Sequence, residues 1–378
     1  MPKVPASASP DIIVVGAGVV GCAVAYELAS RGASVTMVDQ RRPGLGATQA
    51  SAGMLAPYAE AADEGPLFEM GARSLALYDG FVARVRASSG LDVPYVRTGS
   101  LHVATSRESL DRFERTRGIL ERHGVDARVL SAADARAEEP QLGTANVGGL
   151  LVPVHGHVSQ VELTLALTRS AERAGARLLS GVHVTRVSGR GEAGVRVDTS
   201  AGTLDATRVV LAAGAWSSRI HVDAEDARVP VEPVRGQLLY LGWSGDAPRR
   251  IIWNERCYMV PRTDGTVLVG ATVEHAGFDE RTTVAGVRDL LDSACDLLPQ
   301  ASHASLLGAK VGLRPGTPDE LPIIGWSDAV RGLMYATGHY RNGVLLAPLT
   351  ASMVAGAILD GAADPALAWT RPGRFGAI

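Results

Sequence analysis

The chain alternates between segments with strand periodicity and segments with helix periodicity, and the first clear segment begins at Asp11. Residues 12–15 are four consecutive β-branched residues, which are typical of a strand buried on both faces. An alanine-rich segment with a helical pattern follows, and residues 35–39 then form a second strand-like run that ends in an acid. This order of strand, helix and strand predicts the start of a parallel sheet.

The middle of the chain predicts more helices and the return of the chain to this sheet. Charged helices are predicted over residues 67–89 and 107–123, and Gly124 is expected to end the second. The segment from Val161 predicts a helix, a strand, a hairpin and a buried strand over residues 209–211. We expect this last strand to rejoin the parallel sheet, which would then be built from pieces that lie far apart in the sequence.

The pattern changes after residue 230. Alternating strands up to residue 308 predict an antiparallel sheet in a second domain. The last apolar segment, GVLLAPLTASMVAGAIL, is interrupted by Pro348 and two hydroxyl residues and is shorter than the ~18 to 20 residues that span a bilayer, so a buried helix is predicted from about Gly343. The predicted division gives 11–90, 145–225 and 308–365 to the parallel-sheet domain, and 91–144 and 226–307 to the second domain.

Composition narrows the class of protein. The chain has 378 residues, of which 46% are hydrophobic and 20% charged, as expected of a globular protein. The net charge is −3 with scattered basic residues, so neither a nucleic-acid nor a membrane partner is predicted, whereas a homo-oligomer is left open. Cys22, Cys257 and Cys295 have no disulfide or metal spacing, which fits the cytoplasm. The first ten residues are not a signal peptide and are predicted to be a loose tail.

A glycine motif joins the first strand to the first helix. In G-x-G-x-x-G, Gly16 is predicted to make the tight turn, Gly18 to let the backbone approach a pyrophosphate, and Gly21 to let the helix pack closely on the strand. The helix N-terminus offers unpaired N–H groups to phosphates. Asp39 lies about twenty residues beyond the last glycine, where a carboxylate can bind ribose hydroxyls. Together these features predict a dinucleotide site.

Two alternatives accompany this interpretation. The first is a glycine-rich turn without a ligand, which the whole constellation makes improbable. The second concerns the dinucleotide, because NAD and FAD present the same adenosine diphosphate half to this motif. The position of the motif, at the start of a chain with a long insertion before the fold closes, is more typical of flavin enzymes.

Five motifs along the chain read GAGVVG, SAGMLAP, CYMVPR, GLRPGTPDELPIIG and TGHYRNGVLLAP. With these motifs the chain resembles the D-amino-acid oxidase family of flavoproteins, and most closely glycine oxidases of thiamine biosynthesis, from about Asp11 to about Ile358. The resemblance implies an α/β (α+β) fold with a Rossmann-like FAD-binding domain and an antiparallel-sheet substrate domain. Sarcosine oxidases of the broader family bind flavin through a cysteine in the C-terminal region, and none follows Cys295 here, so non-covalent FAD is expected.

The motif and the resemblance together predict the residues beside the cofactor. These are Gly16, Ala17, Gly18, Val19, Val20, Gly21, Asp39, Gln40, Ala47, Thr48, Ala52, Gly53, Met54, Val184, Ala213, Gly214, Trp216, Gly338, His339, Tyr340, Arg341, Asn342, Gly343, Val344 and Leu345. The resemblance further implies that Tyr258, Arg314 and Arg341 are the catalytic residues beside the substrate.

The chemistry of an amino-acid substrate suits these three side chains. A carboxylate is a planar anion, and the guanidinium of Arg314 is its natural partner, with Tyr258 adding a phenolic hydrogen bond. The alternatives are an ion pair of Arg314 with Asp319 or Glu320 and an ordinary half-buried strand tyrosine.

Arg341 lies at the threshold of the predicted C-terminal helix. A helix N-terminus near Gly343 with Arg341 beside it would stabilise negative charge on reduced flavin. The alternative is a turn in which Asn342 and Gly343 set the backbone and the arginine reaches solvent.

Two other features are weaker. His155 and His157 have no partner spaced to complete a metal site and are interpreted as loop histidines, so no metal is predicted. Arg256 and Val273 lie where a pocket wall is expected, and a second arginine there could admit a more acidic or bulkier amine.

The resemblance implies FAD-dependent oxidative deamination of glycine, sarcosine or a small D-amino acid to the imine and oxo acid. Oxygen would be reduced to hydrogen peroxide, and the imine would feed thiamine thiazole synthesis. The first alternative is an amino-acid dehydrogenase of the same fold that uses another electron acceptor. The second is a flavin-binding protein without catalysis, which the presence of Tyr258, Arg314 and Arg341 disfavours.

Overall fold

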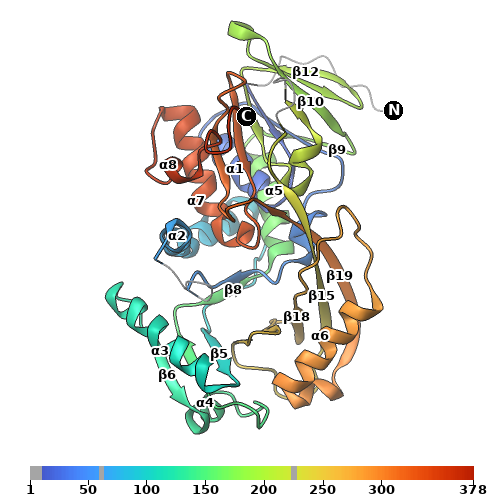
Figure 1. Ribbon diagram of the computed structural model, residues 1–378. Helices are drawn as coiled ribbons and strands as arrows, with labels where there is room; N and C mark the ends of the chain where they lie inside the picture. The colour runs from blue at the N-terminus through green and yellow to red at the C-terminus, as the bar shows by residue number, and fades with distance from the viewer. Residues whose placement is uncertain (1–10, 59–63, 223–227) are drawn as a thin grey trace.

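The computed structural model describes residues 11–58, 64–222 and 228–378, and the segment predicted as a loose tail lies outside the described residues. A six-stranded sheet has the order β20-β21-β13-β1-β2-β9. Its strands are β20 (Ile323–Trp326), β21 (Leu333–Thr337), β13 (Arg208–Leu211), β1 (Ile12–Val15), β2 (Val35–Asp39) and β9 (Arg177–Ser180). All neighbours are parallel except β20 and β21. The predicted return of residues 209–211 to the first strand is confirmed (Figure 1).

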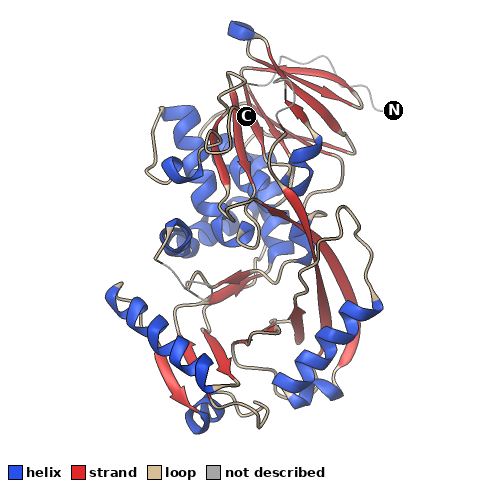
Figure 2. Cartoon of the chain, in the orientation of Figure 1, coloured by secondary structure: helices blue, strands red, loops and turns tan. Residues whose placement is uncertain are grey.

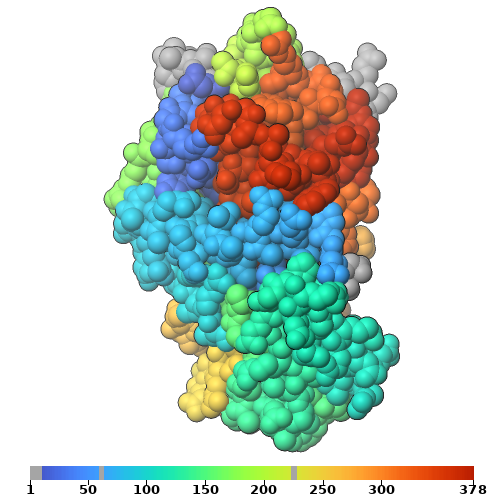
Figure 3. Space-filling model, turned by 90° about the vertical axis from the view of Figure 1, so that its left-hand side faces the viewer, coloured from blue at the N-terminus to red at the C-terminus, as the bar shows by residue number. Residues whose placement is uncertain are grey.

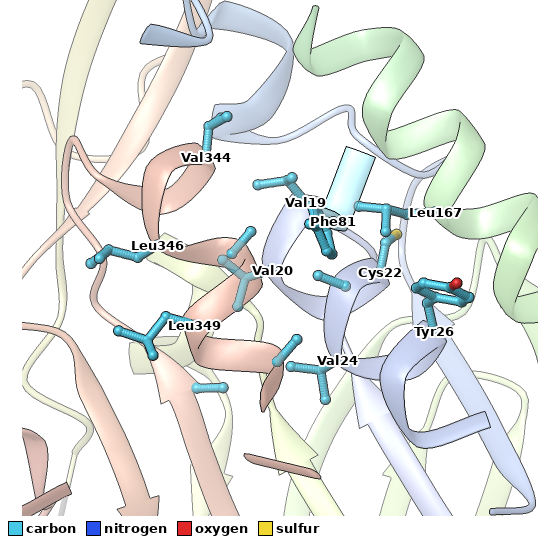
Figure 4. Packing of buried hydrophobic residues seen from close by; sticks show 14 of the residues in the cluster. Val19, Val20, Cys22, Val24, Tyr26, Phe81, Leu167, Val344, Leu346 and Leu349 are labelled. Atoms are coloured by element: carbon cyan, nitrogen blue, oxygen red, sulfur yellow. The ribbon is translucent and has the colours of Figure 1, made fainter. Parts of the chain in front are cut away.

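Helix α1 (Val19–Ser30) is buried on nearly all sides because other helices pack around it. Its neighbours are α5 (Gln160–Arg173) and α7 (Gly343–Ala355), while α2 (Pro66–Ser89) packs on both. Figure 4 shows Val20 and Val24 of α1 facing Leu346 and Leu349 of α7. Burying an aliphatic side chain of this size contributes about 1.5–3 kcal/mol, so this layer fixes the strand-to-helix turn that precedes α1. Figure 3 shows α2 crossing the face where the upper and lower parts of the molecule meet.

The C-terminal helix confirms the buried helix predicted from about Gly343. Pro348 does not interrupt it, and with a π-helical turn over Gly356–Asp360 the helix runs from Gly343 to Asp360. A proline removes the hydrogen bond to the carbonyl four residues earlier. That carbonyl, of Val344, accepts a hydrogen bond from the Tyr78 hydroxyl of α2 at 2.6 Å instead. By length and composition this one helix of the described chain could cross a membrane, but 67% of it is buried inside the protein, as predicted for a core helix.

An eight-stranded sheet forms the second body, with the order β19-β15-β18-β17-β16-β5-β7-β6. Its strands are β19 (Ser305–Gly316), β15 (Glu232–Gly242), β18 (Thr266–Gly270), β17 (Tyr258–Pro261), β16 (Ile251–Trp253), β5 (Ser100–Ala104), β7 (Gly148–Val152) and β6 (Arg128–Ser131). Its pairs are antiparallel except β16 with β5, which confirms the antiparallel sheet predicted after residue 230. Helices α3 (Arg107–Arg122), α4 (Ala132–Glu138) and α6 (Val284–Leu297) accompany it (Figure 2).

Two smaller sheets and a short last helix are also present. The four-stranded sheet contains β12 (Gly202–Ala206), β11 (Val195–Thr199), β10 (Val184–Gly189) and β14 (His221–Val222), and the three-stranded sheet contains β3 (Met54–Leu55), β8 (Gly156–Val158) and β4 (Tyr95–Val96). Helix α8 spans Leu367–Thr370. Strand β7 lies inside the segment 145–225 that was given to the parallel-sheet domain, and β19 crosses the predicted boundary at residue 308, yet both pair within the large antiparallel sheet. The division into two domains otherwise stays a proposal.

Candidate active site

A cavity of about 590 Å³ lies between the two large sheets. The carboxyl ends of the parallel strands form one side of it, through Val15, Asp39, Ala212 and Thr337. Strands β17 and β19 of the antiparallel sheet form the opposite side. Ligands of open α/β sheets bind at the carboxyl ends of the strands, so this cavity is the candidate site.

The three motif glycines have three different surroundings. Gly16 has φ +107°, and a Cβ atom there would lie 2.4 Å from the carbonyl oxygen of Ala212. A Cβ atom at Gly21 would lie 2.0 Å from the carbonyl oxygen of Gly16, so this glycine lets the helix pack on the turn. Gly18 instead lines the cavity, and a Cβ atom there would meet only the Thr48 hydroxyl, at 3.5 Å. The turn therefore leaves its open side to a ligand.

The N-terminus of α1 points to an anionic ligand. Gly18 caps the helix without a side-chain hydrogen bond, and the first turn carries no acid. The N–H of Val19 donates to the hydroxyl of Thr48 at 3.2 Å, which places this predicted cofactor neighbour beside the helix end. Unpaired N–H groups at such an end attract phosphate.

Asp39 completes the dinucleotide side of the cavity. One carboxylate oxygen accepts a hydrogen bond from the N–H of Ala17 at 2.6 Å, and the other accepts one from the N–H of Arg41 at 2.7 Å. Burial raises the pKa of Asp39, and these two N–H groups counteract that effect. A carboxylate oxygen has more than one acceptor direction, so both oxygens can still accept ribose hydroxyls. The glycine turn, the helix end and this fixed carboxylate together fit the adenosine diphosphate half of FAD.

Sequence reasoning missed a contact between the two bodies at this end of the cavity. Arg41 binds Glu280 through both guanidinium nitrogens, at 2.9 and 2.5 Å, and lies over the ring of Trp216 at 4.7 Å. Trp216 in turn meets Phe278, with ring centroids 5.9 Å apart. The segment containing Phe278 and Glu280 thus closes against residues that line the cavity. Only the position of Arg41 just after Asp39 was a signal in the sequence.

Tyr258 and Arg314 line the same cavity on the side of the antiparallel sheet. Arg314 is half-buried on β19 and donates to the carbonyl oxygens of Thr272 at 2.9 Å and Arg235 at 3.3 Å. Asp319, the alternative partner considered for Arg314, binds Arg374 at 2.7 Å. The guanidinium of Arg314 is therefore held against the backbone on the cavity wall, in a position suited to a carboxylate.

Arg341 also lines the cavity, immediately before α7. It is exposed, and its guanidinium lies 4.9 Å from the centre of the Tyr340 ring. The alternative, a turn in which Asn342 and Gly343 set the backbone, differs from the structure, because the left-handed residues of this segment are Gly338 (φ 73°) and Tyr340 (φ 46°). Tyr340 is held by a hydrogen bond from its N–H to the carbonyl oxygen of Pro315 at 3.0 Å, and this turn aims the arginine.

Most predicted cofactor neighbours lie on the cavity wall. The lining contains Gly16, Gly18, Val19, Val20, Asp39, Gln40, Ala47, Thr48, Ala52, Met54, Val184, Ala213, Gly214, Trp216, His339, Tyr340, Arg341, Asn342, Gly343, Val344 and Leu345. Ala17, Gly21, Gly53 and Gly338 lie behind the wall and support it. Gly53, for example, has φ +68°, and a Cβ atom there would lie 1.9 Å from the carbonyl oxygen of Val158. Lining residues that were not predicted include Phe68, Trp253 and Leu313.

Arg256 and Val273 lie on the wall, as the sequence suggested. Arg256 also forms an ion pair with Asp296, and both side chains are more than half exposed. Exposed ion pairs of this kind contribute little to the stability of the fold, and their side chains easily change partners. The second arginine therefore lies on a solvent-exposed part of the cavity wall.

The interpretation of His155 and His157 as loop histidines is confirmed for His155, which lies between β7 and β8, and was wrong for His157, which belongs to strand β8. Both side chains are buried. His155 Nδ1 lies 2.7 Å from the hydroxyl of Ser100, which also lies 3.1 Å from His102 Nε2. Within the described residues, no group of three or more metal-ligating side chains is present.

The buried histidines predict a loss of stability in mild acid. Burial lowers the pKa of His102 and His157 to about 4, that of His339 to about 3, and that of His155 well below its usual range. An unfolded histidine has a pKa of about 6.5, so below that pH the unfolded chain binds protons that the folded chain does not. Each histidine then costs about 1.4 kcal/mol per pH unit until its folded pKa is reached.

The midpoint of thermal unfolding should therefore fall steeply from pH 7 to pH 5, and less steeply in His339→Asn. His339 is suited to this comparison because its Nε2 has one neutral partner, the hydroxyl of Thr350 at 3.0 Å. An equal fall in wild type and variant would contradict the assignment to His339.

Comparisons with known proteins agree with this geometry. Residues 11–357 match the family described as FAD dependent oxidoreductase. The bifunctional protein ThiO/ThiG of Trichormus variabilis is 35% identical over 371 residues, which are 97% of this chain and 55% of that protein, so this chain spans about half the length of that relative. The glycine oxidase of Geobacillus kaustophilus is 34% identical over 91% of this chain and 92% of its own length. The crystal structure of glycine oxidase from Geobacillus kaustophilus superposes with a TM-score of 0.92, at 33% identity, covering 97% of this chain and 98% of that chain.

Proposed function

Because the chain belongs to the FAD dependent oxidoreductase family, we propose that it uses FAD to oxidise the amine of glycine or a similar small amino acid. The predicted resemblance to the D-amino-acid oxidase family, and to glycine oxidases within it, is confirmed. The observation that supports the reaction is the joining of two kinds of site in one cavity: the glycine turn with Asp39 on one side, and Arg314 with Tyr258 on the other. Sarcosine and small D-amino acids belong to the same proposed class.

The side chains of this chain hold and orient the substrate in this proposal. Arg314 binds the substrate carboxylate, Tyr258 adds a hydrogen bond to the same group, and no nucleophile is needed. FAD, when bound, would be the two-electron oxidant, taking the electron pair of the substrate Cα–H bond while the amine loses a proton and the C=N bond of the imine forms. The N-terminus of α7 and the side chain of Arg341 supply positive charge to the cavity. This positive charge favours an anionic state of the cofactor. Water then hydrolyses the released imine to the oxo acid and ammonia.

His339 does not supply that charge. It lines the cavity, but burial lowers its pKa to about 3, so it is neutral at physiological pH. Arg341 and the helix end are therefore the groups of this turn assigned to charge stabilisation. Arg256 on the exposed part of the cavity wall suits a more acidic or bulkier amine. The proposed substrate is therefore the class of small amino acids, with glycine as its smallest member.

Oxygen is the proposed electron acceptor, hydrogen peroxide the product, and thiazole synthesis the proposed use of the imine. The similarity to a ThiO/ThiG protein supports that last step. FAD is proposed to be non-covalent and the compartment cytoplasmic, since the three cysteines are free thiols and Cys22 and Cys257 are buried.

An absorbance spectrum of the purified protein under air-free conditions tests the function directly. Flavin bands that bleach on addition of glycine, and recover with stoichiometric peroxide when oxygen is admitted, are expected. Bleaching with very slow recovery in air would instead show an amino-acid dehydrogenase. Flavin bands that no amino acid bleaches would show a flavin-binding protein without this catalysis.

A further inference from the structure

Two strand glycines lie beneath the side chains assigned to the substrate. Gly236 is in β15, and Gly270 is the last residue of β18, which pairs with β15. Tyr258 of β17 lies directly opposite Gly270 in the strand register. Arg314 of β19 lies opposite Val234, two residues before Gly236, and so on the same face of the sheet as that glycine.

The guanidinium of Arg314 lies across the α-carbon of Gly236. A Cβ atom at Gly236 would be 2.4 Å from both terminal nitrogens of Arg314 and 2.5 Å from the carbon between them. The guanidinium end of Arg314 therefore occupies the space that a side chain at this position would take. The hydrogen bonds from Arg314 to the carbonyl oxygens of Arg235 and Thr272 hold it there.

Tyr258 has an equivalent seat on Gly270. A Cβ atom at Gly270 would be 2.3 Å from the phenolic oxygen, 2.4 Å from Cζ and 2.5 Å from Cε2 of Tyr258. The hydroxyl end of the ring therefore lies against the backbone of the neighbouring strand. The two residues assigned to the substrate carboxylate thus both lie on positions that have no side chain.

A left-handed backbone does not explain these two glycines, because neither has a φ in the left-handed region, unlike Gly16 or Gly53. Glycine in a strand interior is less stable than other residues, and it often marks a close approach by another group. Gly242, in the same strand β15, shows the contrast, because a Cβ atom there would meet Leu307 only at ordinary contact distances of 3.4–3.5 Å.

We propose that Gly236 and Gly270 are positioning residues. Because these two positions have no side chain, the Arg314 guanidinium and the Tyr258 phenol lie close to the sheet, in the place needed to bind a substrate carboxylate. Each glycine is in this sense the seat of one binding side chain. This assignment rests on the proposed function. If it is correct, strands β15 and β18 determine the position of the carboxylate site together with the two binding side chains.

Replacing Gly236 with alanine should displace the guanidinium and leave the strand in place. The atoms that a methyl group would meet are the far end of a flexible side chain, which moves more easily than backbone. We expect the Michaelis constant for glycine to rise on the order of tenfold, with a smaller change in kcat. The reason is that the paired hydrogen bonds between a guanidinium and a carboxylate require a defined geometry. The unfolding midpoint should be unchanged or higher, since alanine is better than glycine within a strand. Gly242→Ala is the matched control and should keep wild-type kinetics.

A double-mutant cycle distinguishes two roles of each glycine: positioning the side chain that lies on it, or supporting the structure in general. In an Arg314→Lys background no planar group lies over residue 236, so Gly236→Ala should raise the Michaelis constant much less than in wild type. Gly270→Ala should likewise have little further effect in a Tyr258→Ala background. Equal effects of either glycine substitution in both backgrounds would overturn the proposal, as would wild-type kinetics for Gly236→Ala.

Binding of acetate, measured by isothermal titration calorimetry on the flavin-loaded protein, tests the seats without turnover. Acetate carries the carboxylate alone, and its dissociation constant should rise in Gly236→Ala as the Michaelis constant does. If wild type binds acetate but oxidises no amino acid, the proposed function fails. The dissociation constants of acetate for the same single and double variants then still test whether Gly236 positions Arg314. A wild type that does not bind acetate rejects the carboxylate site and the seats together.

Discussion

Replacing Arg314 with alanine is expected to raise the Michaelis constant for glycine by at least one to two decades. A charged hydrogen bond contributes about 1.5–3 kcal/mol, which corresponds to that range of fold-change. The structure strengthens the reason for the effect, because Arg314 is held on the cavity wall by two backbone carbonyls and its former alternative partner Asp319 binds Arg374. Steady-state kinetics with glycine, sarcosine and D-alanine measure the loss.

The control for this prediction is another arginine of the same body. Arg288 of α6 is exposed, pairs with its neighbour Asp289 and does not line the cavity, so Arg288→Ala should behave as wild type. Flavin content should be the same in both variants, because Arg314 lies on the wall opposite the dinucleotide turn. An Arg314→Ala variant with wild-type kinetics on every amino acid tested would reject the carboxylate assignment. A variant that loses its flavin would move Arg314 from the substrate to the cofactor.

Features that depend on neighbouring residues in the sequence could be predicted from the sequence alone. Gly16, Gly18 and Gly21 lie within six residues, and their turn, opening and packing contact follow from the local strand and helix. Asp39 ends a strand that pairs with the first one, so its position follows from the same unit.

Features that depend on which distant segments meet could not be predicted. Gly236 shows no special pattern in its strand, and its meaning appears only once Arg314 is placed over it by the pairing of β15 with β19. The C-terminal helix gives a second example. The carbonyl that Pro348 leaves without its usual partner is satisfied by the hydroxyl of Tyr78, which comes from a helix far away in the sequence. His157 gives a third, since its burial follows from the pairing of β8 with β3 and β4.

Gly18→Val should give a folded protein that purifies without the yellow colour of flavin. Gly18 has φ −71° and ψ 176°, an extended conformation that any residue adopts, and a Cβ atom there meets only the Thr48 hydroxyl at 3.5 Å. The valine side chain would therefore fit the protein and fill the space in front of the α1 N-terminus. Blocking two charged hydrogen bonds to a phosphate should weaken FAD binding by at least about a hundredfold. The ratio of flavin to protein absorbance and a fluorescence titration of the apoprotein with FAD measure this change.

Gly21→Val is the matched comparison, because it places the same side chain in the same motif but inside the protein. A Cβ atom at Gly21 would lie 2.0 Å from the carbonyl oxygen of Gly16, which is backbone and cannot move aside cheaply, so this variant should fail to fold. The pair therefore separates a glycine required by the ligand from one required by the fold. A Gly18→Val protein that is folded and fully yellow would show that the turn does not face the pyrophosphate. In that case Asp39 and the α1 N-terminus would have to be reassigned, while the carboxylate site on the opposite wall would be unaffected.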